Sequence, residues 1–277
     1  MKKVICLLTS LFITISTTTF AGAPNFEKIF KGKDACFILF DLTTNKIAIT
    51  YNYNRCNKRF FACSTFKIPI ALMAFDQQIL QDESTVIKWD KINHGDFPNW
   101  NQDQTPNSWL QNSTVWVSQW ITPQIGMNKI KKYLSLFSYG NQDMSGGLTK
   151  AWLSFTLKIS AYEQIYFLEK LWKENLPISS RAIVLTKKCL PQEITPSGGI
   201  LYGKTGSGFL DDRNDPNGRM LGWFVGYLIQ SNHQYVFATN FSDLKRNFSK
   251  SFVTKALSPG EKAKAATKEI LQEMQLY

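Results

Sequence analysis

Ser64-Thr-Phe-Lys-Ile-Pro-Ile-Ala-Leu-Met-Ala-Phe75 is the stretch that decides the fold of this chain. Its side chains are apolar nearly all round, which is the pattern of a fully buried helix. Pro69 is tolerated only in the first turn of a helix, where backbone N–H groups have no partner within the helix. The helix is therefore predicted to begin at about Ser64 or Thr65, with the rest of the molecule packed around it.

Two strands are predicted upstream of this helix. Ala35 to Asp41 is short, apolar and aromatic, and Ile47 to Tyr51 has a similar character. Thr43-Thr-Asn-Lys46 lies between them and supplies turn residues, which favours a hairpin over a buried helix.

Downstream of the buried helix, the character of the chain changes twice. From about Asp76 to Pro191 helical patterns joined by polar loops dominate, and Ala161 to Trp172 is the clearest amphipathic example. After Pro196-Ser-Gly-Gly199 the pattern becomes strand-like. The predicted elements there are strands over Ile200 to Ser207, Leu221 to Ile229 and Gln234 to Asn240, and a closing helix over Pro259 to Gln275.

Strands near both ends of the chain therefore flank a helical middle. The predicted architecture is of the α/β (α+β) class, with one antiparallel sheet built from both termini and flanked by helices, plus a helical domain. The predicted boundaries are 22–63 and 197–277 for the sheet domain and 64–196 for the helical domain, with the active site between them.

Residues 1–21 have the features of a signal peptide. Lys2 and Lys3 form a positive end, Val4 to Ile15 is a short apolar run, and Thr19-Phe20-Ala21 is a small-residue cleavage site. The alternative is a membrane anchor, but a membrane span needs about 20 apolar residues and this run is shorter. We therefore expect a periplasmic or secreted protein without stable membrane association.

The composition of the 277-residue chain excludes disorder, because 44% of its residues are hydrophobic and 19% are charged. The formal net charge is +11, but Lys and Arg are scattered without a basic stripe or a recognition motif. No nucleic-acid partner is therefore predicted. A surface of this charge favours small anionic ligands instead. The sequence makes no prediction of the oligomeric state.

Four cysteines remain after removal of the signal peptide: Cys36, Cys56, Cys63 and Cys189. Export permits disulfides, and we predict a bridge between Cys56 and Cys63 that fixes the backbone just before Ser64. Two unpaired buried thiols are the alternative, and Cys36 and Cys189 are left unassigned. Because the chain has no CxxC pair and only two histidines, no metal site is predicted.

Ser64 and Lys67 lie three residues apart, which brings both side chains to one face of a helix. A serine hydroxyl is a poor nucleophile until a base takes its proton. A lysine amine serves as that base only when burial lowers its pKa from about 10.4. The apolar helix supplies this burial, and free N–H groups at its start can stabilise an oxyanion. By itself the spacing also fits a serine that only caps a helix.

Lys204-Thr-Gly206 lies on a predicted strand. The lysine and the hydroxyl are suited to a substrate carboxylate, and Gly206 allows substrate backbone to approach closely. Taken alone, this motif is also typical of an ordinary strand that ends in a bend. Three other features are, alone, more typical of loops or of the core: Ser113-Thr-Val115, Tyr139-Gly-Asn141 and Trp152.

Together and in this order, these motifs resemble the signature set of the class D β-lactamases, the oxacillinases. Three further segments look like those that link the family's motifs: Trp89-Asp90, Trp100-Asn-Gln-Asp103 and Ser145-Gly-Gly147. The resemblance runs from about Ala35 to the final helix. It implies a β-lactamase/transpeptidase-like fold and a serine enzyme that hydrolyses β-lactam antibiotics through an acyl-enzyme, which confers resistance.

The resemblance also implies roles for the catalytic residues. Ser64 would be acylated by the β-lactam carbonyl. Lys67 would carry a carbamate formed from CO2, with no other cofactor, and act as the base in acylation and deacylation. Ser113 would relay protons to the lactam nitrogen, and Trp152 would donate its indole N–H to the carbamate.

Other matching residues would bind the substrate. Val115 would wall the base pocket, and Lys204 and Thr205, followed by Gly206, would line the substrate side. The backbone N–H groups of Ser64 and Ser207 would form the oxyanion hole.

One feature departs from the family pattern. Many relatives have an arginine near the start of the last helix that holds the substrate carboxylate. This chain offers four basic residues in that region, and the sequence does not select among them: Arg246, Lys250, Lys262 and Lys264.

Two alternatives remain open. A penicillin-binding DD-peptidase shares Ser-x-x-Lys and Lys-Thr-Gly but typically has asparagine where Val115 stands. A β-lactam sensor domain, a binding module rather than an enzyme, has similar motifs but is joined to a membrane-embedded partner domain. Substrate preference, including carbapenem hydrolysis, depends on loop shapes such as that of Phe209 to Met220.

Overall fold

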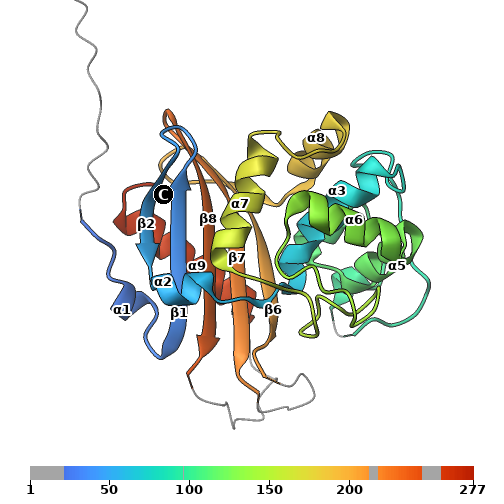
Figure 1. The fold of residues 1–277 in the computed structure, drawn as a ribbon, viewed down its shortest axis with the longest axis horizontal. Coiled ribbons are helices and arrows are strands. Elements are labelled where there is room, and N and C mark those ends of the chain that lie inside the picture. Colours follow the sequence, from blue (N-terminus) through green and yellow to red (C-terminus); the bar gives the residue numbers. More distant parts are fainter. Residues whose placement is uncertain (1–21, 96, 212–217, 245–256) are drawn as a thin grey trace, which may run out of the picture.

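A six-stranded antiparallel sheet with the order β2-β1-β8-β7-β6-β5 forms the centre of the computed structural model (Figure 1). The structure describes residues 22–95, 97–211, 218–244 and 257–277. The strands are β1 (Lys33–Asp41), β2 (Lys46–Tyr51), β5 (Gln192–Ile194), β6 (Ile200–Phe209), β7 (Met220–Gln230) and β8 (His233–Asp243). The sheet thus joins strands from both ends of the chain. The predicted signal peptide, Arg246 and Lys250 lie outside the described residues.

Helices cover both faces of the sheet (Figure 1). One face packs against α1 (Phe26–Ile29) and α9 (Pro259–Glu273), with a core that includes Phe37, Phe224 and Ile270. The other face packs against α2 (Tyr53–Asn57) and α7 (Ala161–Trp172). The fold class predicted from the sequence, an antiparallel sheet flanked by helices, is confirmed.

Further helices lie beside the sheet edge that carries β5 and β6 (Figure 1). They are α3 (Lys67–Asp76), α4 (Pro106–Asn112), α5 (Val115–Ile125), α6 (Met127–Phe137) and α8 (Ser180–Cys189). A two-stranded sheet of β3 (Phe60–Phe61) and β4 (Lys158–Ile159) connects this part to α7.

Helix α3 is buried at every residue from Lys67 to Phe75, and only its last residue, Asp76, is partly exposed. The chain enters it through a 3-10 turn, η1 (Cys63–Phe66), so that Pro69 falls in the first turn of the α-helix. Helix α7 begins with a capping box in which Ser160 and Glu163 satisfy each other's backbone N–H groups. Helix α9 begins with the same device, made by Ser258 and Glu261.

The predicted disulfide between Cys56 and Cys63 is wrong, because all four cysteines are free buried thiols. The two side chains lie against different elements. The Cys56 thiol donates to the carbonyl of Tyr51 at 3.4 Å. The Cys63 sulfur lies beside β6, where a Cβ added to Gly208 would approach it to 2.6 Å.

None of the helices in the described ranges combines the length and the apolar character that a membrane crossing requires.

Candidate active site

Ser64 lies in η1 and is half-buried, one turn before the buried Lys67. The Lys67 Nζ donates to the Ser64 Oγ at 3.1 Å. The segment is fixed from behind, because the Cys63 N–H donates to the Trp152 carbonyl at 2.9 Å and the Ala62 N–H donates to a carbonyl of the segment before β4. Cys63 itself has a left-handed backbone with φ of 50°. The structure therefore brings the predicted nucleophile and base into direct contact.

Lys67 is poised to be an uncharged amine. Burial lowers its pKa well below the usual value, and the nearby charge of Lys204 lowers the pKa further. The Cys63 thiol opposes this shift, but burial raises its own pKa to about 12, so that it stays uncharged. A neutral amine has the lone pair that the proton of a serine hydroxyl requires.

Trp152 is fully buried beside this pair and packs on Phe66, with ring centroids 5.6 Å apart. Its indole Nε1 has no hydrogen-bond partner among the described residues. A buried N–H without a partner costs free energy, and such groups cluster where a ligand or water is bound. Tyr139 packs on the other side of Phe66 at 5.5 Å, so the surroundings are largely apolar.

Ser113 and Lys204 form a second polar pair in the site. The Lys204 Nζ donates to the Ser113 Oγ at 3.0 Å and to the Thr205 carbonyl at 3.2 Å. Ser113 ends α4 in a left-handed conformation with φ of 56°, and Val115 begins α5. Burial lowers the pKa of Lys204 to about 7. The charge of Lys204 also lowers the pKa of Lys67, so the Ser113–Lys204 pair and the Ser64–Lys67 pair belong to one site.

Strand β6 packs closely on η1, and glycine makes this possible. A Cβ on Gly206 would lie 3.2 Å from the Thr65 side chain, and one on Gly208 would lie 2.5 Å from the Ser154 Oγ. Larger residues would separate the strand from the nucleophile segment. Thr205 is half-buried and Ser207 is exposed at this contact.

The first turn of α9 lies over the same part of β6. The Gly260 N–H donates to the Ser207 Oγ at 2.9 Å, and a Cβ on Gly260 would approach Thr205 to 2.9 Å. Of the basic residues considered for the substrate carboxylate, Lys264 is paired with Glu193 at 2.8 Å and Lys262 is exposed.

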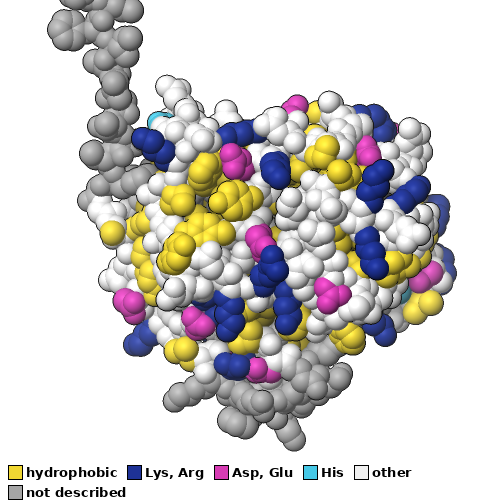
Figure 2. Space-filling view, viewed as in Figure 1, with side chains coloured by type: hydrophobic (Ala, Val, Ile, Leu, Met, Phe, Trp, Pro, Cys, Tyr) yellow, Lys and Arg dark blue, Asp and Glu magenta, His cyan; other side chains and the backbone are white. Residues whose placement is uncertain are grey.

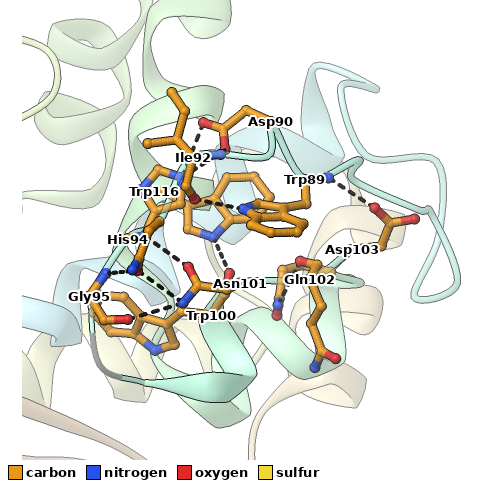
Figure 3. A network of polar contacts seen from close by, with 12 residues as sticks. Trp89, Asp90, Ile92, His94, Gly95, Trp100, Asn101, Gln102, Asp103 and Trp116 are labelled. Atoms are coloured by element: carbon orange, nitrogen blue, oxygen red, sulfur yellow. Dashed lines mark hydrogen bonds and ion pairs between the residues drawn. The ribbon is translucent and has the colours of Figure 1, made fainter.

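A network of polar contacts links residues between Trp89 and Asp103 to Trp116 (Figure 3). The Trp116 indole donates to the Trp100 carbonyl at 2.7 Å, and the Trp100 indole donates to the Asn112 carbonyl at 3.0 Å. Within the segment, His94 contacts Asp90 at 2.9 Å (Figure 3). This network supports the backbone next to Ser113.

Tyr139-Gly-Asn141 supports the site from a greater distance. The Asn141 side chain accepts the Lys158 N–H at 2.8 Å and donates to the Thr156 carbonyl at 2.8 Å. A Cβ on Gly140 would lie 2.0 Å from the Lys158 carbonyl. The motif thus fastens the chain that runs from Trp152 into β4.

The sequence did not indicate two residues of this site. Ser154 has a left-handed backbone with φ of 56° and accepts the Phe209 N–H at 3.1 Å, which ties the Trp152 segment to β6. Gly260 contacts β6 from the start of α9. Neither belongs to a motif, and only the tertiary packing makes them visible.

Comparison with known proteins places this geometry in a family. Residues 25–271 match the family described as "Penicillin binding protein transpeptidase domain". The chain is 42% identical to beta-lactamase OXA-1 of Escherichia coli, over 86% of this chain and 90% of that protein. The solved structure of class D beta-lactamase BAT-2 superposes with a TM-score of 0.77 at 35% identity, covering 91% of this chain and 95% of that one.

A relative of another kind also matches. The methicillin resistance mecR1 protein of Staphylococcus aureus is 35% identical over 89% of this chain, but the match covers 39% of that longer protein.

Proposed function

We propose a catalytic mechanism for this chain, which belongs to the class D β-lactamases within the penicillin-binding transpeptidase family. Members of this class are serine enzymes, and the chain is a serine β-lactamase that hydrolyses the amide bond of β-lactam antibiotics. The observation that carries the mechanism is the 3.1 Å contact between Ser64 Oγ and a fully buried Lys67.

In the acylation step Lys67 takes the proton of Ser64, and the Ser64 Oγ attacks the lactam carbonyl carbon. The backbone N–H groups of Ser64 and Ser207 stabilise the resulting oxyanion. The C–N bond then breaks, and the lactam nitrogen receives a proton through Ser113, whose hydroxyl accepts a hydrogen bond from the Lys204 Nζ.

Deacylation requires a base that activates water. A carbamate on Lys67 would supply anionic oxygens as the base, both toward Ser64 and toward the hydrolytic water, and Lys67 is the residue that would hold it. Three features of this chain suit such a group: an amine that burial keeps neutral, the apolar ring of Phe66, and the indole N–H of Trp152, which has no partner among the described residues. A buried anion is costly unless it is hydrogen-bonded, and Trp152 offers a donor.

The substrate carboxylate is held by Lys204 and Thr205 in this proposal. The first turn of α9 lies against the same strand, and its N-terminal end carries the positive end of the helix dipole. Because Lys264 is already paired and Lys262 is exposed, neither is assigned to this role.

The proposal includes the place of the enzyme in the cell. The apolar run before Ala21 serves as a signal peptide, so that the mature enzyme acts in the periplasm or outside the cell.

The sheet domain (22–63 and 197–277) and the helical domain (64–196) form the two walls of the site in this proposal.

Peptide mapping by mass spectrometry after exposure to a slowly hydrolysed β-lactam tests the proposal. We expect the adduct on the peptide that contains Ser64, and Ser64→Ala should lower turnover by at least about 10⁴-fold. An adduct on another residue, or normal turnover by Ser64→Ala, contradicts the assignment.

The similarity to the mecR1 protein keeps a β-lactam sensor as the second candidate. Turnover of a chromogenic cephalosporin separates the two. A β-lactamase hydrolyses many equivalents of substrate per enzyme, whereas a sensor or a penicillin-binding DD-peptidase gives one stoichiometric burst.

A further inference from the structure

A pocket of about 300 Å³ lies outside the Ser64 site. Its lining residues come from the start of β1, from the segment between α2 and β3, and from β4. Others lie just after the end of β6 and just before the start of β7. Its floor includes the rings of Phe60 and Phe61. Five cationic side chains line it: Arg55, Lys58, Arg59, Lys158 and Arg219.

The carboxylates around the pocket do not balance these cations. Each arginine has one carboxylate partner: the pairs are Arg55–Asp34, Arg59–Glu163 and Arg219–Asp211. Lys58 and Lys158 have no ion pair within the described part of the chain. Each instead lies over an aromatic ring, Lys58 over Phe60 at 5.7 Å and Lys158 over Phe61 at 4.8 Å. Within the described ranges, two positive charges at this pocket therefore lack an ion-pair partner.

Arg55 contributes a guanidinium to the pocket lining, and this side chain is buried rather than on the surface. Its side chain is 4% exposed, and its guanidinium donates to Asp34 at 2.5 Å and to Asn240 at 2.7 Å. Its Nε has no hydrogen-bond partner in the described part of the chain, and the Asp34 side chain is 48% exposed. A buried guanidinium with one half-exposed counterion is only partly compensated, and an anion nearby would stabilise it.

Figure 2 shows Lys and Arg side chains gathered on this face, over α2 and the ends of β6 and β7. The guanidinium groups of arginine and the ammonium groups of lysine are the hydrogen-bond donors that bind phosphate oxygens, and here they surround one pocket. A chloride or a single carboxylate would neutralise one of the two excess charges, whereas a dianion neutralises both. The pocket volume of about 300 Å³ exceeds that of a phosphate ion, so the pocket has room for a chemical group attached to the phosphate.

We propose that this pocket is a second ligand site, which binds a phosphate group that is free or carried by a phosphomonoester. The site is independent of the β-lactam chemistry, because Ser64, Lys67, Ser113 and Lys204 do not line it.

Isothermal titration calorimetry of the full mature protein tests the proposal, with ionic strength held constant by sodium chloride. The probes are inorganic phosphate and glycerol 2-phosphate. We expect saturable 1:1 binding of phosphate, weakened at least tenfold in the double variant Lys58→Gln/Lys158→Gln. The matched control Lys46→Gln/Lys132→Gln also removes two charges, from exposed lysines of β2 and α6 that do not line the pocket, and should leave the affinity within twofold.

Binding of both probes supports a site for the phosphate group itself, and binding of inorganic phosphate alone supports a site for the free anion. Absence of saturable binding up to 20 mM overturns the proposal. Equal affinity in the double variant overturns it too, because phosphate would then bind elsewhere. Circular dichroism shows whether each variant is folded, and no step of the test depends on β-lactam hydrolysis.

Discussion

Two buried lysines without carboxylate partners in the described part of the chain define the active site at the scale of the residue. Lys67 contacts Ser64 and Lys204 contacts Ser113, and the exposed fraction of each lysine is at most 1%. Burial of an unpaired ammonium is unfavourable, so both pKa values fall. The burial that suits Lys67 to its proposed role as a base therefore destabilises the fold.

Lys204→Met should abolish efficient turnover and yet stabilise the protein at pH 6. The pKa of Lys204 is about 7 in the folded chain and about 10.4 when unfolded. Between these values the unfolded chain binds a proton that the folded chain lacks, so wild-type stability rises from about pH 7 to about pH 10. Below pH 7 the buried charge of Lys204 lowers the free energy of unfolding by its full amount, on the order of 5 kcal/mol at most.

Thermal denaturation at pH 6 and pH 9 measures this effect. The melting temperature of Lys204→Met should exceed that of the wild type by several degrees at pH 6, and the difference should shrink at pH 9. Lys46→Met, at an exposed lysine, is the control and should change little. A lower melting temperature for Lys204→Met at pH 6 contradicts the account.

The spacing of Ser64 and Lys67 was enough to predict their contact, because residues three apart meet on one helical face. The left-handed backbone of Cys63 and the role of Ser154 were not predictable. Both arise from contacts with distant segments: the Cys63 N–H donates to Trp152, 89 residues away, and Ser154 accepts from Phe209, 55 residues away. The same contacts separate Cys63 from Cys56, which is why the predicted disulfide was wrong.

At the scale of the element, the active site depends on the approach of β6 to η1. Gly206 and Gly208 leave no side chain between the strand and the nucleophile segment. Ser207 lies between these two glycines and is the residue whose N–H we assign to the oxyanion hole. Any displacement of β6 would therefore separate the oxyanion donor from Ser64.

Gly208→Ala should lower both stability and acylation. The added methyl group would lie 2.5 Å from the Ser154 Oγ and 2.6 Å from the Cys63 Sγ, so that β6 must shift. Overpacking of this kind costs about 1–3 kcal/mol, and we expect kcat/KM to fall at least tenfold. Gly22→Ala, where a methyl group meets nothing within 4 Å, is the control. Unchanged acylation by Gly208→Ala, measured by stopped flow, would show that the close approach is dispensable.

Long, patterned elements were predictable and short ones were not. The amphipathic pattern predicted α7 over Ala161–Trp172, and the apolar runs predicted β7 and β8. The five-residue α2 and the two-residue strands β3 and β4 depend on tertiary pairing and leave no periodic signal. The predicted helical domain (64–196) also contains β5, a three-residue edge strand paired with β6.

At the scale of the whole molecule, the site forms only when distant parts of the chain meet. Strand β1 pairs with β8, and η1 packs on β6. The sequence predicted a sheet from both termini, but the order of its strands is a property of long-range pairing that local patterns do not contain. The proposed anion pocket is likewise assembled from residues in or next to six separate elements and matches no sequence motif.

The predicted signal-peptide cleavage site determines which residue we expect at the N-terminus of the mature protein. Edman sequencing of the enzyme isolated from its producing cells should begin at Gly22, directly after the Thr19-Phe20-Ala21 cleavage site. Recovery of a chain that begins at Met1 from the active fraction would rule out the signal peptide.

Carbon-13 NMR of the enzyme equilibrated with ¹³C-bicarbonate tests most directly whether Lys67 works as a carbamate. We predict a carbamate resonance that tracks activity, is lost in Lys67→Ala, and is lost as acid protonates the amine. Trp152→Phe removes the indole donor and should require about 10- to 100-fold more bicarbonate for the same signal, because a hydrogen bond to a charged group contributes about 1.5–3 kcal/mol. Full activity at mildly acidic pH in CO2-depleted enzyme that shows no carbamate resonance would contradict the account.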